Sequence, residues 1–282
     1  MIKVDNNEKH ISLSWKSDNS ALIFKSILGA KSIENISARL MCTINTNRDR
    51  LTGCAMSEAG SLLFLQLYQN KLLKYEPNGK FTSESGILPD QDYFGFDLAV
   101  VDSHIVAISC GGNPSTQICL INLKSAELHQ ILCLGDWCYG LSFHNGSVIC
   151  CTHDKGIKIF DRSCQNSTNI RLLPNVPNRV DETYVTSNEI GIFHSNWGDN
   201  SVVCYNFSGQ VQWTYSDSLL RKPYGITLDS YSNIYVAGSA SNNVVVISKD
   251  GKQAKQLIGP SDGILNPRAV FFHKNQKRTS CS

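Results

Sequence analysis

Residues 222–253 read KPYGITLDSYSNIYVAGSASNNVVVISKDGKQ. Three apolar runs (GITL, IYVAG and VVVIS) are separated by turn residues, and none of the residues stands out as a nucleophile or a metal ligand. Short runs of β-branched and aromatic residues bounded by Asp, Ser, Asn and Gly are typical of strands joined by tight turns. The stretch therefore predicts an antiparallel meander with strands near 225–229, 233–238, 244–248 and 252–258, and the polar fourth strand is expected at the edge.

A similar pattern returns along the whole chain. The leading strand of each unit is anchored at residues 53, 95, 140, 183, 225 and 268, so that successive units are 42 to 45 residues apart. Most anchors are followed by a strand, a polar loop, a second strand and a turn. Six units of four strands each predict an all-β, six-bladed β-propeller, in which radial repetition leaves only short protected edges.

Composition sets the outer bounds of the function. The net charge of +2 and the 41% apolar residues favour a globular domain without a dominant electrostatic partner. Apolar runs stay below the roughly 18 residues that a membrane span needs, and the N-terminus lacks a basic segment followed by an apolar run. The sequence thus predicts a cytoplasmic protein that binds neither a membrane nor a small-molecule cofactor.

Eleven cysteines are a high number for this length. A disulfide or zinc framework would account for them, but the sequence has no Cys-x-x-Cys and their number is odd. Several lie inside apolar strands, where a free thiol behaves as a small hydrophobic side chain: Cys54, Cys110, Cys119, Cys150 and Cys204. The prediction is reduced core thiols, as a cytosolic chain keeps them.

The meander and the segments that flank it carry a family resemblance. Residues 222–253, SDGILNPRAVFFHKNQK (261–277) and WCYGLSFHNGSVICC (137–151) resemble NHL-type six-bladed propellers. More closely, they resemble the propeller that ends tripartite-motif-like proteins expanded in bivalve molluscs. That resemblance implies the partner- or substrate-recognition part of a ubiquitin-ligase family. The RING that would give ligase activity, the B-box and the coiled coil are not found in this sequence, so it predicts no catalytic residue, cofactor or metal ligand.

The two ends of the chain suggest how the ring closes. A leader at 1–36 is expected to hold a strand and a short helix at 21–28, followed by the propeller at 37–282. Only 14 residues follow Arg268, so the last blade is expected to be incomplete. Since an uncovered blade edge is unstable, a strand at about 40–46 is the predicted closing strand.

Recognition is expected on the loops of one face. The loop before the first strand of a blade and the loop between its second and third strands share a face, and loops on a rigid scaffold are the usual place for binding. The candidate binding residues are Arg221, Lys222, Arg268, Trp197, Trp137, Tyr93 and Lys155. These aromatic and basic types predict a protein partner first.

Two alternatives remain open. Some NHL propellers bind single-stranded RNA on this face, which requires a basic surface with stacking aromatic side chains. Other six-bladed propellers hold a divalent metal in the channel and hydrolyse lactones or phosphoesters. Oxygen ligands for such a lactonase-like site could come from four acidic residues: Asp97, Asp136, Asp181 and Glu182. Their positions in the repeat are inconsistent, which ranks the enzyme last.

Overall fold

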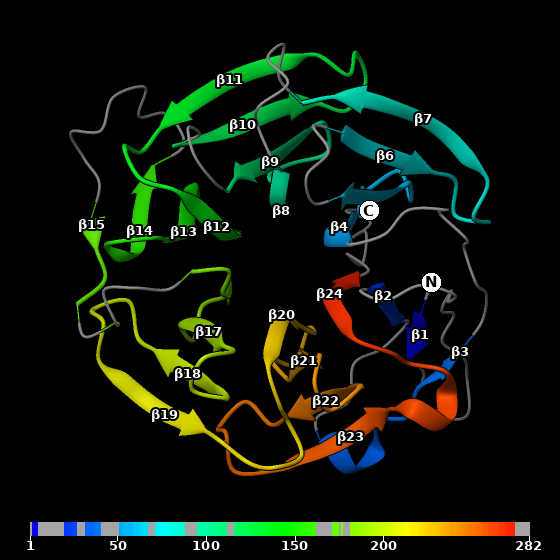
Figure 1. Cartoon of the computed structure of the whole chain (residues 1–282), viewed down its shortest axis with the longest axis vertical. Helices are drawn as coiled ribbons and strands as arrows, with labels where there is room; N and C mark the ends of the chain where they lie inside the picture. The colour runs from blue at the N-terminus through cyan, green and yellow to red at the C-terminus, as the bar shows by residue number, and fades with distance from the viewer. Residues whose placement is uncertain are drawn as a thin grey trace, which may run out of the picture.

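The computed structural model describes residues 2–4, 20–26, 32–40, 51–66, 71–87, 95–111, 116–161, 171–174, 176 and 181–273. These residues form an all-β propeller in which four-stranded sheets surround a central axis (Figure 1). Besides strands, two short 3-10 helices occur in this part of the chain, η1 (Ile33–Asn35) and η3 (Pro260–Asp262). Neither is long or apolar enough to cross a membrane.

Five blades are continuous antiparallel meanders, each running from an inner strand at the axis to an outer strand at the perimeter. The first blade comprises β4 (Leu51–Met56), β5 (Leu62–Gln66), β6 (Lys71–Tyr75) and β7 (Phe81–Gly86). The second comprises β8 (Gly95–Val100), β9 (Ile105–Cys110), β10 (Gln117–Asn122) and β11 (Leu128–Cys133). The third comprises β12 (Cys138–His144), β13 (Ser147–Thr152), β14 (Gly156–Asp161) and β15 (Arg171–Leu172). The fourth comprises β16 (Tyr184–Ser187), β17 (Ile192–Asn196), β18 (Ser201–Tyr205) and β19 (Val211–Tyr215).

The fifth blade is the meander predicted from the opening stretch. Its strands are β20 (Pro223–Leu228), β21 (Ile234–Gly238), β22 (Asn243–Ile247) and β23 (Ala254–Ile258). The middle strands β21 and β22 are completely buried, whereas β23 is partly exposed at the perimeter. The prediction of four strands with a polar outer strand is confirmed.

The sixth sheet is assembled from both ends of the chain. Its order is β24 (Pro267–His273), β2 (Ser20–Ser26), β1 (Ile2–Val4) and β3 (Arg39–Leu40). Strand β2 pairs in parallel with β24, and β1 pairs in parallel with β2. We call this sheet the closing sheet, because β24 packs between β20 of the fifth blade and β4 of the first blade.

One expectation for the leader is corrected by the closing sheet. The helix expected at 21–28 is instead strand β2, because Leu22 and Ile23 are both buried, on opposite faces. Leu22 packs into the cluster with the fifth blade, whereas Ile23 packs into the cluster with the first blade. The strand that pairs directly with β24 is β2. Leu40 lies in the outermost strand β3, and residues 41–46 fall outside the described residues.

The repeated glycine has a steric cause. A Cβ atom on Gly140 would lie 2.4 Å from the Cα of Tyr184, and one on Gly225 would lie 2.7 Å from the carbonyl oxygen of Arg268. Each glycine thus lets one inner strand approach the backbone of the next inner strand around the axis. The close approach explains why Tyr-Gly returns at this point of the repeat.

The cysteines that the structure describes are free, and all of them except Cys133 are buried. The prediction of buried core thiols holds for the five cysteines expected in apolar strands. Burial raises the pKa of Cys54, Cys150 and Cys204, that of Cys204 to about 11.

One buried histidine yields a stability prediction. His194 is 1% exposed, neither ring nitrogen has a hydrogen-bond partner among the described residues, and burial lowers its pKa to about 4. His194→Leu should therefore raise the free energy of unfolding by about 1 kcal/mol at neutral pH, since a buried unpaired polar group is costly. Below pH 6.5 the histidine is protonated in the unfolded chain but stays neutral in the folded protein, which destabilises the parent. The difference in unfolding free energy between His194→Leu and the parent should therefore grow as the pH falls to about 4. Urea unfolding of both proteins across this range measures the difference, and a gain that does not change with pH would contradict the assignment.

Candidate functional site

The axis of the propeller is closed on one side by side chains from the inner strands. The Tyr184 hydroxyl reaches across the axis and donates a hydrogen bond of 2.8 Å to the carbonyl oxygen of Thr52 in the first blade. Burial raises the pKa of Tyr184, so this hydroxyl stays a donor. The Phe96 ring contacts the Tyr139 ring edge to face and the Tyr184 ring at a tilt, with a centroid distance of 5.1 Å in both pairs.

Arg268 completes this layer from the closing sheet. Its guanidinium lies 4.7 Å from the centroid of the Tyr224 ring and 5.7 Å from that of Phe96, within cation–π range. Its Nη2 donates to Glu182 Oε2 at 2.6 Å. We call these residues the plug: Phe96, Tyr139, Tyr184, Tyr224, Arg268 and Glu182. They join the second, third, fourth and fifth blades to the closing sheet.

Loops around the plug form a continuous face, as the sequence predicted. Lys222 precedes an inner strand, and its backbone amide donates to Asn200 Oδ1 at 2.7 Å. One blade further on, the amide of Asn266 donates to Asn242 Oδ1 at 2.8 Å. All four residues have positive φ, between 44° and 53°. The same left-handed turn and the same bond therefore tie each of these inner-strand loops to the second–third-strand loop of the preceding blade.

Two tryptophans lie on this face where the third and fourth blades meet. The Trp137 ring is 4.4 Å from the His153 ring, centroid to centroid, and the His153 Nδ1 is hydrogen-bonded to the Asp181 carboxylate. Trp197 Nε1 donates to the backbone oxygen of Asp181 at 2.9 Å. Both indoles are half-buried, so each presents part of its ring to solvent while the other part is fixed.

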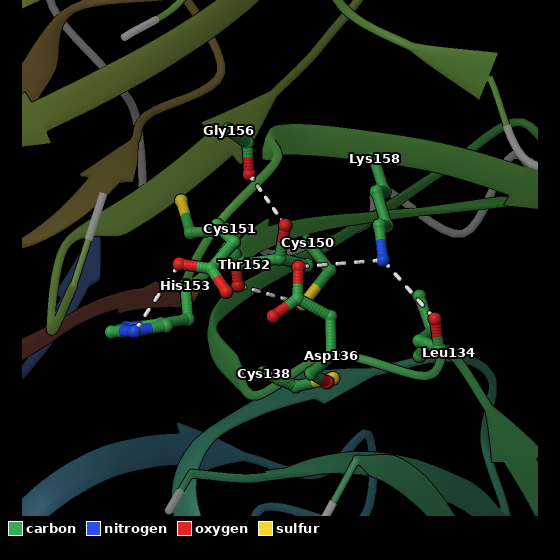
Figure 2. A network of polar contacts seen from close by, with 10 residues as sticks. Leu134, Asp136, Cys138, Cys150, Cys151, Thr152, His153, Gly156 and Lys158 are labelled. Atoms are coloured by element: carbon green, nitrogen blue, oxygen red, sulfur yellow. Dashed lines mark hydrogen bonds and ion pairs between the residues drawn. The ribbon is translucent and has the colours of Figure 1, made fainter. Parts of the chain in front are cut away.

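Asp136, an acidic residue of the same face, is buried. Lys158 Nζ lies 3.6 Å from Asp136 Oδ2 and donates to the carbonyl oxygen of Leu134 at 3.1 Å (Figure 2). The Lys158 and Asp136 side chains are 4% and 6% exposed. Removing one partner of such a pair leaves a buried charge without compensation, so this pair is structural.

The structure separates the predicted binding residues into three groups. Lys155, Arg221 and Lys222 are exposed, and Trp137 and Trp197 are half-buried. We call the loops that hold them the rim: Trp137, His153–Gly156, Asp181, Asn196–Asn200, Arg221, Lys222 and Ser239–Asn243. Tyr93 lies outside the described residues.

Arg268 is the correction among the predicted binding residues. It was expected on the exposed face, but its side chain is 12% exposed and belongs to the plug. Two aromatic rings and Glu182 surround it, and these partners come from three other blades.

The four acidic residues considered as metal ligands lie in different surroundings. Asp136 pairs with Lys158, Asp181 pairs with His153, Glu182 pairs with Arg268, and Asp97 accepts hydrogen bonds from backbone amides. Within the described residues, no group of three or more His, Cys, Asp or Glu side chains could hold a metal ion. A converging oxygen site of the lactonase kind is thus not formed by these four residues.

Beyond the plug, the axis opens into a cavity of about 640 Å³. The inner strands of all five blades and β24 line it, and Tyr184 and Asp97 are among the lining residues. Sequence reasoning considered Asp97 for the channel but missed Phe96 and Tyr184. A usable signal was that Phe96 and Tyr184 lie one residue after the anchors at 95 and 183 of the repeat.

Comparisons with known proteins agree with this architecture. A family model described as a beta-propeller repeat matches residues 215–244, which is the fourth-to-fifth blade junction and half of the fifth blade. A search of curated proteins finds no match. A protein of unknown function from Bacteroides thetaiotaomicron is similar in structure, with a TM-score of 0.64 and 12% identity over 79% of this chain and 64% of that one. The chain thus spans less than two thirds of that protein.

Two lyase structures are similar as well. A streptogramin B lyase gives a TM-score of 0.57 with 18% identity over 74% of this chain and 69% of that chain. A catalytically inactive histidine-to-alanine variant of virginiamycin B lyase from Staphylococcus aureus, solved with quinupristin, gives 0.62 with 12% identity over 85% and 78%. At these identities the likeness shows a fold and not an activity. The chain is a β-propeller.

Proposed function

We propose that the chain is a non-catalytic recognition propeller whose rim binds an acidic segment of a partner protein. The observation that carries this proposal is which charged side chains of the rim face are paired with one another and which are exposed to solvent. Of its acidic side chains, Asp136, Asp181 and Glu182 are each held by a basic residue or histidine, whereas Asp154 and Asp199 are exposed. Its cations Lys155, Arg221 and Lys222 extend into solvent.

The aromatic residues of the rim support the same proposal. Trp137 and Trp197 are fixed by contacts with His153 and Asp181, so binding would order little that is not already ordered. Rigid tryptophans beside basic side chains are the residue types on which protein interfaces concentrate their binding energy. Asp154, whose side chain is 71% exposed, and the exposed Asp199 disfavour an acidic segment at those two points of the rim.

A wider biological role follows from the sequence resemblance. We propose an NHL-type, tripartite-motif-like propeller that recognises partners or substrates for a ubiquitin ligase. We place it in the cytoplasm, because the buried free thiols that the structure describes are those of a chain kept reduced. The resemblance supports this role, and the rim charges support the choice of partner.

A selection of peptides tests the proposal. A displayed library of random peptides, captured by the full chain, should yield sequences rich in Asp and Glu. The variant Arg221→Glu with Lys222→Glu should bind the selected peptides at least about tenfold more weakly, because rim charges steer association. Its unfolding free energy should change by about 0.5 kcal/mol or less.

The matched control reverses two exposed lysines of the fifth blade, Lys249→Glu with Lys252→Glu. This control has the same change of net charge but lies on the turn that joins β22 to the outer strand β23. Equal loss of affinity in both variants would indicate a non-specific charge effect, and no loss in either would show that the rim is not the binding surface.

Single-stranded RNA is the second candidate, and the same ion pairs favour it. Asp136, Asp181 and Glu182, which would repel RNA, are paired, and the exposed cations and two half-buried indoles are the features that phosphates and bases use. A labelled random-sequence RNA oligonucleotide separates the two candidates. Binding that falls steeply with salt and is lost in the Arg221, Lys222 variant, with no peptide enrichment, would replace the protein partner by RNA.

A further inference from the structure

The axial cavity faces the side of the propeller opposite to the rim. The inner strands all run away from the rim, so that Tyr184 and Cys54 lie at the plug end of the cavity and Glu58, Ser187 and His273 at its mouth. Tyr184 and the other plug residues separate the cavity from the rim. At about 640 Å³ the cavity has the size of small-molecule sites.

Asp97 is the buried acid of this cavity. The residue is 9% exposed and lines the wall near the plug. Its Oδ1 accepts the amide of Leu98 at 2.8 Å, and its Oδ2 accepts the amide of Leu141 from the next blade at 2.9 Å. A carboxylate can accept about four hydrogen bonds, so each oxygen retains capacity for another donor.

Other side chains give the cavity two chemical zones. Hydroxyl groups bridge neighbouring blades along the wall: Ser142 and Ser187 are 2.7 Å apart, and Thr227 Oγ1 accepts the amide of Phe272 at 3.1 Å. The wall also carries apolar side chains: Met56, Val100, Phe143, Ile226, Leu228 and Val270. Glu58 and His273 are also among the lining residues.

We propose that the cavity binds a small organic ammonium compound, with the ammonium group hydrogen-bonded to Asp97 and an apolar body against the wall toward the mouth. Two carboxyl groups line the cavity, and Arg268 of the adjoining plug is paired with Glu182. The field in the cavity therefore favours a cation. This site is independent of the rim and lies on the other side of the plug.

The titration of Asp97 agrees with a cationic occupant. Burial raises its pKa to about 7, against the effect of the two backbone amides. The titratable groups packed against it, Cys54, Cys151 and Tyr184, have raised pKa values and stay neutral near pH 7. A bound ammonium group stabilises the ionised carboxylate, so binding should release a proton and weaken as the pH falls below about 7.

Calorimetric titration of the full chain tests this with phenethylamine and cyclohexylamine as cations, phenethyl alcohol as a neutral analogue and hydrocinnamate as an anion. At least one amine should bind with a stoichiometry of one, the alcohol should bind at least about tenfold more weakly, and hydrocinnamate should not bind. Affinity for the amine should rise roughly twentyfold from pH 5.5 to pH 7.5. Titrations in two buffers of different ionisation enthalpy should show proton release.

Three variants locate the site. Asp97→Asn should abolish amine binding, and Thr186→Trp should do the same by filling the cavity from β16 without changing the carboxylate. Glu127→Gln, which removes an exposed acid outside the cavity, should leave binding unchanged. If Asp97→Asn does not fold, amine binding by Thr186→Trp decides whether the cavity is the binding site. Binding that survives Thr186→Trp, equal affinity for amine and alcohol, or no saturable binding of either amine would overturn the proposal.

Discussion

Leu22→Ala combined with Ile23→Ala should lower the free energy of unfolding by about 4–8 kcal/mol, since each buried large-to-small change costs about 2–5 kcal/mol. The two side chains are 0% and 3% exposed and pack into different clusters, on the fifth and the first blade. Their losses should therefore add nearly completely. Because the free energy of unfolding of a protein domain is about 5–15 kcal/mol in total, the double variant would lose most of it. Urea unfolding followed by tryptophan fluorescence measures the loss.

The control makes the same kind of change at exposed positions. Leu128→Ala combined with Val211→Ala removes two aliphatic side chains that are 38% and 50% exposed, and it should cost about 1 kcal/mol or less. If the Leu22, Ile23 variant is no less stable than this control, β2 does not close the ring in the way described above.

Arg268→Glu should be the most damaging single substitution in the plug, with a loss of about 3–5 kcal/mol. The new carboxylate would replace a guanidinium that lies over two aromatic rings, and it would face Glu182. Repulsion and burial of an unpaired charge then act together. Thermal unfolding should show a fall in the melting temperature of many degrees.

Two further variants show whether the loss of stability comes from the charge reversal itself or from its place in the plug. Arg221→Glu makes the same reversal on the exposed rim and should change stability by about 0.5 kcal/mol or less. Glu182→Arg added to Arg268→Glu should recover part of the loss by restoring an ion pair. A melting temperature of Arg268→Glu equal to that of Arg221→Glu would show that the plug does not stabilise the propeller.

The regular part of the fold could be predicted from the sequence because its information is local. In residues 223–258 the first three strands are apolar runs and the outer strand is polar. Each turn has its own Asn, Asp, Ser or Gly, and every partner strand is the next in the chain. The closing sheet is different, because β2 pairs with a strand almost 250 residues away. A short apolar run such as Ala21–Phe24 suits a helix or a buried strand equally well, so the local pattern could not decide.

The candidate site could likewise be predicted from the sequence only in part. The shared face of the loops follows from chain reversal within each blade, and the sequence predicted it correctly. The burial of Arg268 depends on Tyr224, Phe96 and Glu182, which other blades supply. The Asp97 carboxylate accepts a hydrogen bond from the backbone amide of Leu141, 44 residues further along the chain. Contacts between blades depend on how the blades stack around the axis, and a pattern within one repeat does not contain that information.

Hydrogen exchange with and without a selected acidic peptide tests the central claim, which is recognition at the rim. Amides of His153–Gly156, Asn196–Asn200 and Ser239–Asn243, together with Arg221 and Lys222, should exchange more slowly in the complex. Amides of the outer strands β19 and β23 should keep their rates. Protection of the outer strands, or of the cavity mouth around Ser187 and His273, with unchanged rim amides would contradict the account.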